Sequence, residues 1–172
     1  MGPVETLKGN GILASGDKMK NSLCVSGRVR FILTDVKTGA VDVGPWVKNI
    51  VPLSGRTAIA RRLVNAAALE NEGMITYGAV GTGITVPTNS DTTLGTELAR
   101  KLAATRTNTD NKITIWIFFT TAEANGSLKE FGLFGEAASA TADSGTLFQR
   151  VLIDKVKDNT KTLTVESIVE IT

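Results

Sequence analysis

The segment from Lys112 to Thr120 restricts the possible folds of this chain more than any other segment. Alternate positions form one wholly apolar face, which carries Ile113, Ile115, Ile117 and Phe119. The opposite face is also largely apolar, because Trp116 and Phe118 follow each other on it between two threonines. A period of two predicts a β-strand. A strand that is apolar on both faces lies at the centre of a sandwich or is covered by another subunit, so we expect Trp116 and Phe118 to be interface residues.

Other segments share this period and predict further strands. They begin near Val25 and cover residues 28–35, 41–50, 74–80, 128–134, 146–156 and 162–171, with one more strand from about Leu98. Pro45 interrupts the segment 41–50, which predicts an edge strand or a bent strand. Asn125-Gly126 predicts a hairpin between the strands 112–120 and 128–134, because both residues tolerate positive φ.

Residues 54–69 form the clearest helical pattern. Ser54 is a suitable N-cap, and an apolar stripe recurs at Ile59, Leu63, Ala66 and Ala67. The polar face of this helix is basic and carries Arg56, Arg61 and Arg62. We expect this face either to be solvated or to contact an acidic neighbour.

These patterns predict a mainly β chain. We expect an antiparallel, jelly-roll-like β-sandwich with one inserted α-helix, formed as a single domain by residues 22–172. Met1–Asn21 contains several glycines and little periodicity, which predicts an extended arm that reaches towards a neighbour in an assembly.

The composition argues against the common kinds of catalytic and metal site. The chain has no histidine and a single cysteine, Cys24, so Ser-His and Cys-His pairs, His-ligated zinc and an intrachain disulfide are excluded. Its net charge of +2 is too balanced to predict binding to nucleic acid. We therefore expect no enzyme activity, no cofactor and no bound metal.

Two weaker patterns, a glycine-rich loop and a set of carboxylates, contain the residue types of a chemical site. Gly78, Gly81 and Gly83 lack the spacing and the following helix of a phosphate-binding loop. Five carboxylates could supply a glycosidase pair in an enzyme that degrades the cell envelope: Asp91, Glu97, Glu123, Glu130 and Glu136. The sequence cannot place two of them at the required separation, and solvated or ion-paired carboxylates are the simpler interpretation.

No segment predicts insertion into a membrane or secretion. Apolar runs stay well below the roughly 18 residues that a span needs, and Met1–Asn10 has no apolar signal region. We expect the protein to be made in a host cytoplasm.

The order of short motifs is similar to that of a group of small virion structural proteins of tailed bacteriophages. The resemblance covers residues 25–172. In chain order the motifs are Lys48-Asn49-Ile50-Val51, Gly55-Arg56 with the alanine-rich helix, Ile75–Gly83, Pro87, Asp91-Thr92-Thr93-Leu94, Glu97-Leu98-Ala99-Arg100, Lys129–Phe134, Leu147-Phe148-Gln149-Arg150 and the alternating final strand.

This resemblance implies a tail- or fibre-associated virion protein that acts by self-assembly, as a trimer or a ring, and by docking to other virion proteins. Capsid decoration, a collar position and a module that binds host carbohydrate through Trp46, Tyr77 or Trp116 are the alternatives. Ion pairs are expected between Glu97 and Arg100, and between Glu130 and either Arg100 or Arg150, within the chain or between subunits, which makes these four residues interface candidates.

Overall fold

The computed structural model describes residues 23–64 and 74–172. The helix in these ranges is α1 (Leu53–Val64). The strands are β1 (Val25–Asp35), β2 (Val41–Val43), β3 (Val47–Lys48), β4 (Ile75–Gly81), β5 (Glu97–Thr109), β6 (Lys112–Phe119), β7 (Gly126–Gly135), β8 (Thr146–Lys157) and β9 (Lys161–Ile171). The predicted arm Met1–Asn21 and the predicted helix beyond residue 64 lie outside the described residues.

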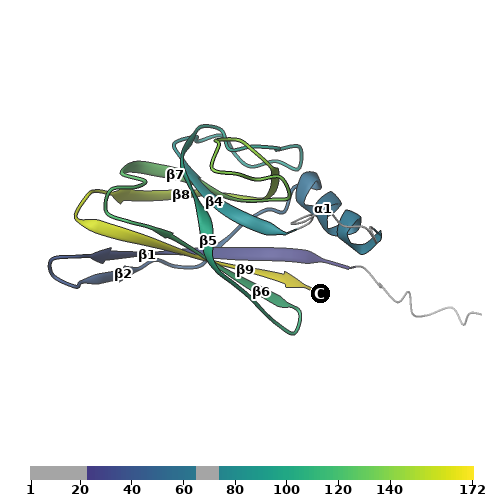
Figure 1. Ribbon diagram of the computed structural model, residues 1–172, viewed down its shortest axis with the longest axis horizontal. Helices are drawn as coiled ribbons and strands as arrows, with labels where there is room; N and C mark the ends of the chain where they lie inside the picture. Colours follow the sequence, from purple (N-terminus) through teal and green to yellow (C-terminus); the bar gives the residue numbers. More distant parts are fainter. Residues whose placement is uncertain (1–22, 65–73) are drawn as a thin grey trace, which may run out of the picture.

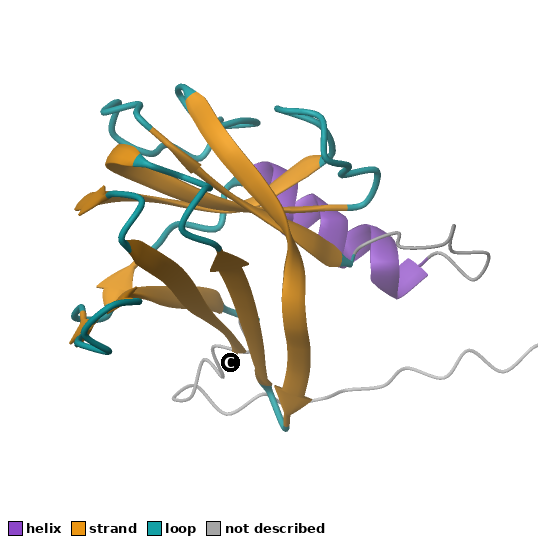
Figure 2. Ribbon diagram, turned by 60° about the vertical axis from the view of Figure 1, so that its left-hand side comes forward, coloured by secondary structure: helices purple, strands orange, loops and turns teal. Residues whose placement is uncertain are grey.

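All nine strands belong to one antiparallel sheet with the order β2-β1-β9-β6-β5-β4-β7-β8, in which β3 also pairs with β1. Strand β5 is long enough for its two parts to pair with different strands. Its residues 103–109 pair with β6, and its residues 97–102 pair with β4. The sheet curls at this strand into two halves that face each other (Figures 1 and 2). We call them the β1–β9 half, with β2, β3 and β6, and the β7–β8 half, with β4.

The curl brings the two ends of the sheet together. Ile50 follows β3, and its amide donates to the carbonyl of Arg150 at 3.0 Å. The amide of Arg150 donates back to the carbonyl of Ile50 at 3.1 Å, which forms an antiparallel bridge to β8. Helix α1 lies against β8, where a Cβ on Gly55 would come within 2.3 Å of the Phe148 carbonyl oxygen. Glycine at position 55 therefore allows the helix backbone to approach the strand closely.

The main core lies between the two halves. The rings of Phe31 and Phe131 meet edge to face across it, with centroids 5.7 Å apart. Ile115, Ile117 and Phe119 point into this core and are buried, whereas Phe118 on the other face is 40% exposed. The two faces predicted for the segment 112–120 are therefore confirmed.

The mainly β, antiparallel class with one inserted helix is confirmed. The finer expectation of a jelly-roll-like sandwich is not confirmed, because β5 passes without a break from one half to the other and makes a single curled sheet. Two separate strands at 41–43 and 47–48, interrupted around Pro45, agree with the predicted bent edge strand.

The predicted Asn125-Gly126 hairpin is wrong. Strand β6 has β5 and β9 on its two edges, so no edge is left for β7, which pairs instead with β4 and β8. Ala124 and Gly126 do adopt positive φ, at 54° and 131°. The motif thus marked a turn, but that turn carries the chain from one half of the sheet to the other.

The details of the helix also differ from the prediction. Ser54 lies in the first turn, and its hydroxyl donates to the carbonyls of Asp91 and Leu147 instead of capping the helix. The buried positions are Gly55 and Ala58, with Ile59 half-buried, whereas Leu63 is 75% exposed. Close packing against β8 favours the small residues over the predicted apolar stripe.

Candidate functional site

The β1–β9 half has one face that points away from the core, and Trp46, whose ring lies against Arg28 and Arg30, covers part of it. We call it the outer face. It consists of the side chains of β1, β9 and β6 that point away from the core: Arg28, Arg30, Ile32, Thr114, Trp116, Phe118, Thr164, Glu166 and Ile168. The β7–β8 half differs, because a second cluster of Ala79, Leu94, Phe134 and Leu147 lies on its other side beneath the loops 82–96 and 136–145.

An apolar row crosses the outer face. The register places Val43 of β2 beside Ile32, then Thr164, then Phe118. Val43 is 54% exposed and Phe118 is 40% exposed, and Leu102 on the adjoining strand β5 is 58% exposed. Exposed apolar side chains that gather in this way mark interaction surfaces more often than isolated ones do.

The next row is polar and is paired within the chain. Arg30 lies beside Glu166, which lies beside Trp116. The Arg30 Nε atom donates to Glu166 Oε2 at 2.6 Å. The guanidinium groups of Arg28 and Arg30 also lie 4.9 and 4.6 Å from the centroid of the Trp46 ring. These contacts hold the charged groups of the outer face in place and neutralise Glu166.

Glu130 and Arg150 form a buried ion pair between the neighbouring strands β7 and β8. Arg150 Nη2 donates to Glu130 Oε2 at 2.7 Å, and Arg150 Nε donates to the same oxygen at 3.0 Å. The backbone amides of Gly83, Gly95 and Thr96 donate to the carboxylate at 2.8–2.9 Å. Glu130 has no exposed surface. Of the two partners predicted for Glu130, the structure selects Arg150.

Asp91 joins this pair from the loop 82–96. Its Oδ2 atom accepts from Arg150 Nη1 at 2.6 Å and from the Thr88 amide at 3.0 Å. Arg150 Nη2 also donates to the Thr85 carbonyl at 3.1 Å. The three ionic side chains therefore fasten the glycine-rich loop onto the β7–β8 half, as a folded connector.

The pKa of the Glu130 carboxyl lies below its ordinary value. Burial favours the neutral form, but the hydrogen bonds from Gly95, Thr96 and Arg150 favour the carboxylate more strongly. The pKa of Asp91 is lowered in the same way, because Thr88 and Arg150 outweigh the effect of burial. Both groups stay ionised well into the acid range.

These lowered pKa values predict acid sensitivity. The unfolded chain binds protons at these carboxyls near their ordinary pKa values of 4.5 and 3.8, whereas the folded chain does not. The stabilisation that these two carboxyls contribute should therefore be constant above about pH 5 and decrease steadily as the pH falls below it. Urea denaturation at a series of pH values measures this decrease. A free energy of unfolding that stays constant down to about pH 3 would contradict the assignment.

Glu97 and Arg100 form the second predicted pair, and this pair fastens the other loop. Arg100 Nε and Nη2 donate to the two carboxylate oxygens of Glu97, both at 2.6 Å. Arg100 Nη1 donates to the carbonyls of Ser139 and Ser144 at 3.1 and 3.0 Å. The guanidinium group lies 4.6 Å from the centroid of the Phe134 ring. Both side chains are 3% exposed, so they are engaged within the chain.

The three predicted basic residues of α1 differ in their surroundings. Arg61 forms an ion pair with Glu136, with Nη1 2.9 Å from Oε1, so it has an acidic partner in its own chain. Arg56 is exposed on the helix. Arg62 is exposed too, and its side chain lies at the edge of a pocket.

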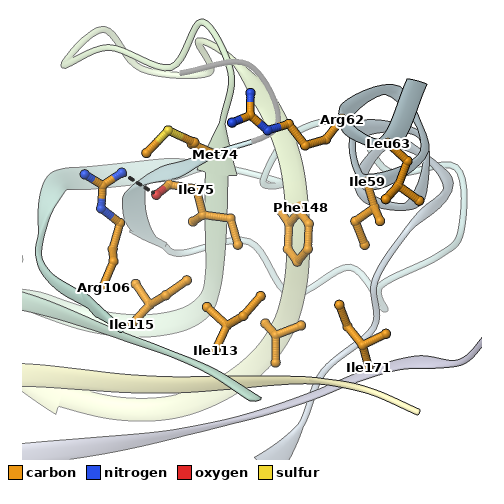
Figure 3. Close-up of a pocket in the computed structure, with 11 residues that line it drawn as sticks. Ile59, Arg62, Leu63, Met74, Ile75, Arg106, Ile113, Ile115, Phe148 and Ile171 are labelled. Atoms are coloured by element: carbon orange, nitrogen blue, oxygen red, sulfur yellow. Dashed lines mark hydrogen bonds between the residues drawn. The ribbon is translucent and has the colours of Figure 1, made fainter. Parts of the chain in front are cut away.

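Sequence reasoning missed this pocket, which has a volume of about 470 Å³ and lies between α1 and the two halves of the sheet (Figure 3). Among the described residues eleven line the pocket, of which nine are apolar and the other two are Arg62 and Arg106. The lining comes from six elements: α1, β4, β5, β6, β8 and β9. No local spacing in the sequence signals a site assembled from so many segments.

The described residues give no sign of a metal centre, since they contain no group of three His, Cys, Asp or Glu side chains that could hold an ion. Among the described helical residues there is no helix of the length and hydropathy that a membrane crossing requires. No protein-family model matches the chain, and no significantly similar curated protein or solved structure was found.

Proposed function

We propose that this chain is a structural protein of a tailed-bacteriophage particle and that it acts by binding copies of itself and neighbouring virion proteins. The resemblance in motif order supports the phage assignment, and we place the protein at the tail or its fibres. The observation that carries the assembly role is the outer face, with its apolar row in which Val43 and Phe118 are exposed and Ile32 is half-buried.

A second copy of the chain is the occupant that fits this face best. Two sheets stack face to face at about 10 Å when their facing side chains are apolar, and an apolar row at the centre of a face provides that contact. Arg30 and Glu166 already neutralise each other, and Arg28, which is exposed and lies against the Trp46 ring, is the remaining charged group of the outer face. A net charge of +2 gives little repulsion between copies.

The replacement Phe118→Asp tests self-association. We expect it to weaken association at least about tenfold, because burying a large apolar side chain contributes about 1.5–3 kcal/mol and a buried carboxylate without a partner opposes contact. The fold should persist, since Phe118 is 40% exposed and points away from the core. Sedimentation velocity of the full chain over a range of concentrations measures the effect.

Val156→Asp is the matched control. Val156 is 67% exposed on β8, in the other half of the sheet, so this variant should associate like the wild type. A wild-type chain that stays monomeric at every concentration would refute self-association. Equal association of the Phe118→Asp variant and the wild type would exclude the outer face as the contact.

The position in the particle defines two alternatives, a capsid-decorating protein and a collar protein. All three positions would use the same outer face, and a low-resolution map of the particle with this chain located distinguishes them. Carbohydrate binding is the remaining alternative. Trp46 and Trp116 are half-buried, and Tyr77 packs against the second cluster, so each presents only part of its ring to a sugar. A glycan array tests this alternative directly.

A further inference from the structure

The pocket between α1 and the sheet combines an apolar interior with a cationic edge. Ile59, Ile75 and Phe148 form its walls, and Ile113 and Ile115 of β6 lie below them (Figure 3). We propose that this pocket binds a single-chain anionic amphiphile, with an unbranched apolar tail and a carboxylate or similar anionic head. This inference does not depend on self-association.

The interior suits an apolar tail. Pockets that bind small molecules commonly measure about 300–1,000 Å³ and are lined mainly by apolar side chains, and a volume of about 470 Å³ falls in this range. Five of the apolar residues are isoleucines from three strands and α1: Ile59, Ile75, Ile113, Ile115 and Ile171. A tail that enters this space removes apolar surface of both ligand and protein from water, which favours binding.

The edge suits an anionic head. The side chains of Arg62 and Arg106 come from α1 and β5, and in Figure 3 their guanidinium groups are drawn on either side of Met74. Arg106 Nη1 donates to the Ile75 carbonyl at 3.2 Å, which leaves its other N–H groups for a ligand. Neither arginine forms a salt bridge with an acidic residue in the described ranges. Two guanidinium groups at one edge select an anion over a neutral or cationic head.

Three probes with nearly equal tails separate the contribution of the head from that of the tail: dodecanoate, 1-dodecanol and dodecyltrimethylammonium. Calorimetric titration of the full chain below the micelle concentration should show one site for dodecanoate. The alcohol should bind at least about tenfold more weakly, as expected from the loss of one charge-assisted hydrogen bond. Dodecyltrimethylammonium should bind more weakly still. Native mass spectrometry checks the one-to-one stoichiometry.

Variants place the binding in this pocket. Arg62→Gln and Arg106→Gln should each weaken dodecanoate binding several-fold, while Arg62→Lys keeps most of it. Arg56→Gln is the matched control, because Arg56 is exposed on α1 and does not line the pocket. Ile59→Trp fills the pocket from the half-buried face of α1 and should abolish binding, with circular dichroism to confirm the fold. Equal binding of all three probes, no binding of dodecanoate, or unchanged binding by both Arg→Gln variants would overturn the proposal.

Discussion

The replacement of Glu130 by glutamine is expected to lower the free energy of unfolding by about 3–5 kcal/mol, the usual cost of removing one partner from a buried ion pair. Chemical denaturation measures this loss. Glu130 has no exposed surface, so water cannot replace what the carboxylate provides. A loss of this size would remove a large part of the stability of an ordinary domain.

The cost arises because every neighbour of the carboxylate is a donor. Three backbone amides and two guanidinium nitrogens donate to its two oxygens. A glutamine side chain has one oxygen and one NH₂ group, so at least one donor would face another donor. Arg150 would also keep only the half-exposed loop residue Asp91 as an anionic partner. The loop 82–96 should then detach before the rest of the fold, and hydrogen exchange at Gly83, Gly95 and Thr96 would detect this.

Asp154→Asn provides the control. Asp154 also pairs across β7 and β8, with Lys129 at 2.5 Å, but its side chain is 80% exposed. Exposed pairs of this kind contribute little, so the loss of this pair should leave the unfolding transition nearly unchanged.

The Glu130→Gln variant should also lose part of the acid sensitivity of the wild type. Some would remain, because Lys101 and Thr120 lower the pKa of Glu123 to about 2. Equal stability of the Glu130→Gln variant and the wild type would contradict a structural role for this pair.

The two glutamate–arginine pairs share one structural role. One pair joins β7 and β8, and the other lies on the part of β5 that pairs with β4. Each arginine uses its remaining donors to fasten a loop: Arg150 reaches Thr85, and Arg100 reaches Ser139 and Ser144. The loops in turn cover the β7–β8 half. The four residues were predicted as interface candidates, and their contacts in the structure lie within the chain. Of the other candidates, Phe118 and the half-buried Trp116 lie on the outer face, and Arg56 and Arg62 are exposed on α1.

The sequence predicted the strands well because a strand between a core and another environment shows a period of two in its own residues. It failed on the connection at Asn125-Gly126, because a turn motif reports local backbone angles and not which edges of a strand are free. The tight hairpin between β5 and β6 was missed for the same reason. Asp110 in this turn adopts a φ of 51°. Only the pairing of Thr109 with Lys112 distinguishes the hairpin from an ordinary loop.

The sites were predictable in kind but not in partner. The sequence allowed two partners for Glu130, which were Arg100 and Arg150. The register between β7 and β8 selects Arg150, because it places Arg150 beside Gly132, two residues from Glu130. The pairing of Arg30 with Glu166 depends likewise on β1 and β9 being neighbours, although 136 residues separate the two side chains in sequence. The pocket depends on the positions of six elements at once, so it could be found only in the folded chain.

The second large effect is expected for Phe131→Ala, which should lower the free energy of unfolding by about 3–5 kcal/mol. Phe131 has no exposed surface. Its ring meets Phe31 of the opposite half, and it lies near Gly78, where an added Cβ would come within 3.2 Å of it. Apart from β5 and the bridge at Ile50, the two halves contact each other through the main core. A cavity at the centre of this core therefore weakens the packing of one half against the other.

Phe118→Ala is the matched control for this prediction, because it makes the same chemical change on the opposite side of the β1–β9 half. Its cost to the monomer should stay below about 1 kcal/mol, since Phe118 is 40% exposed and contributes nothing to the core between the halves. Denaturation of both variants at low protein concentration separates the fold from association. If the two variants lost equal stability under these conditions, Phe118 would be part of the monomer's own packing, and the outer face would not be the open surface on which the proposed self-association depends.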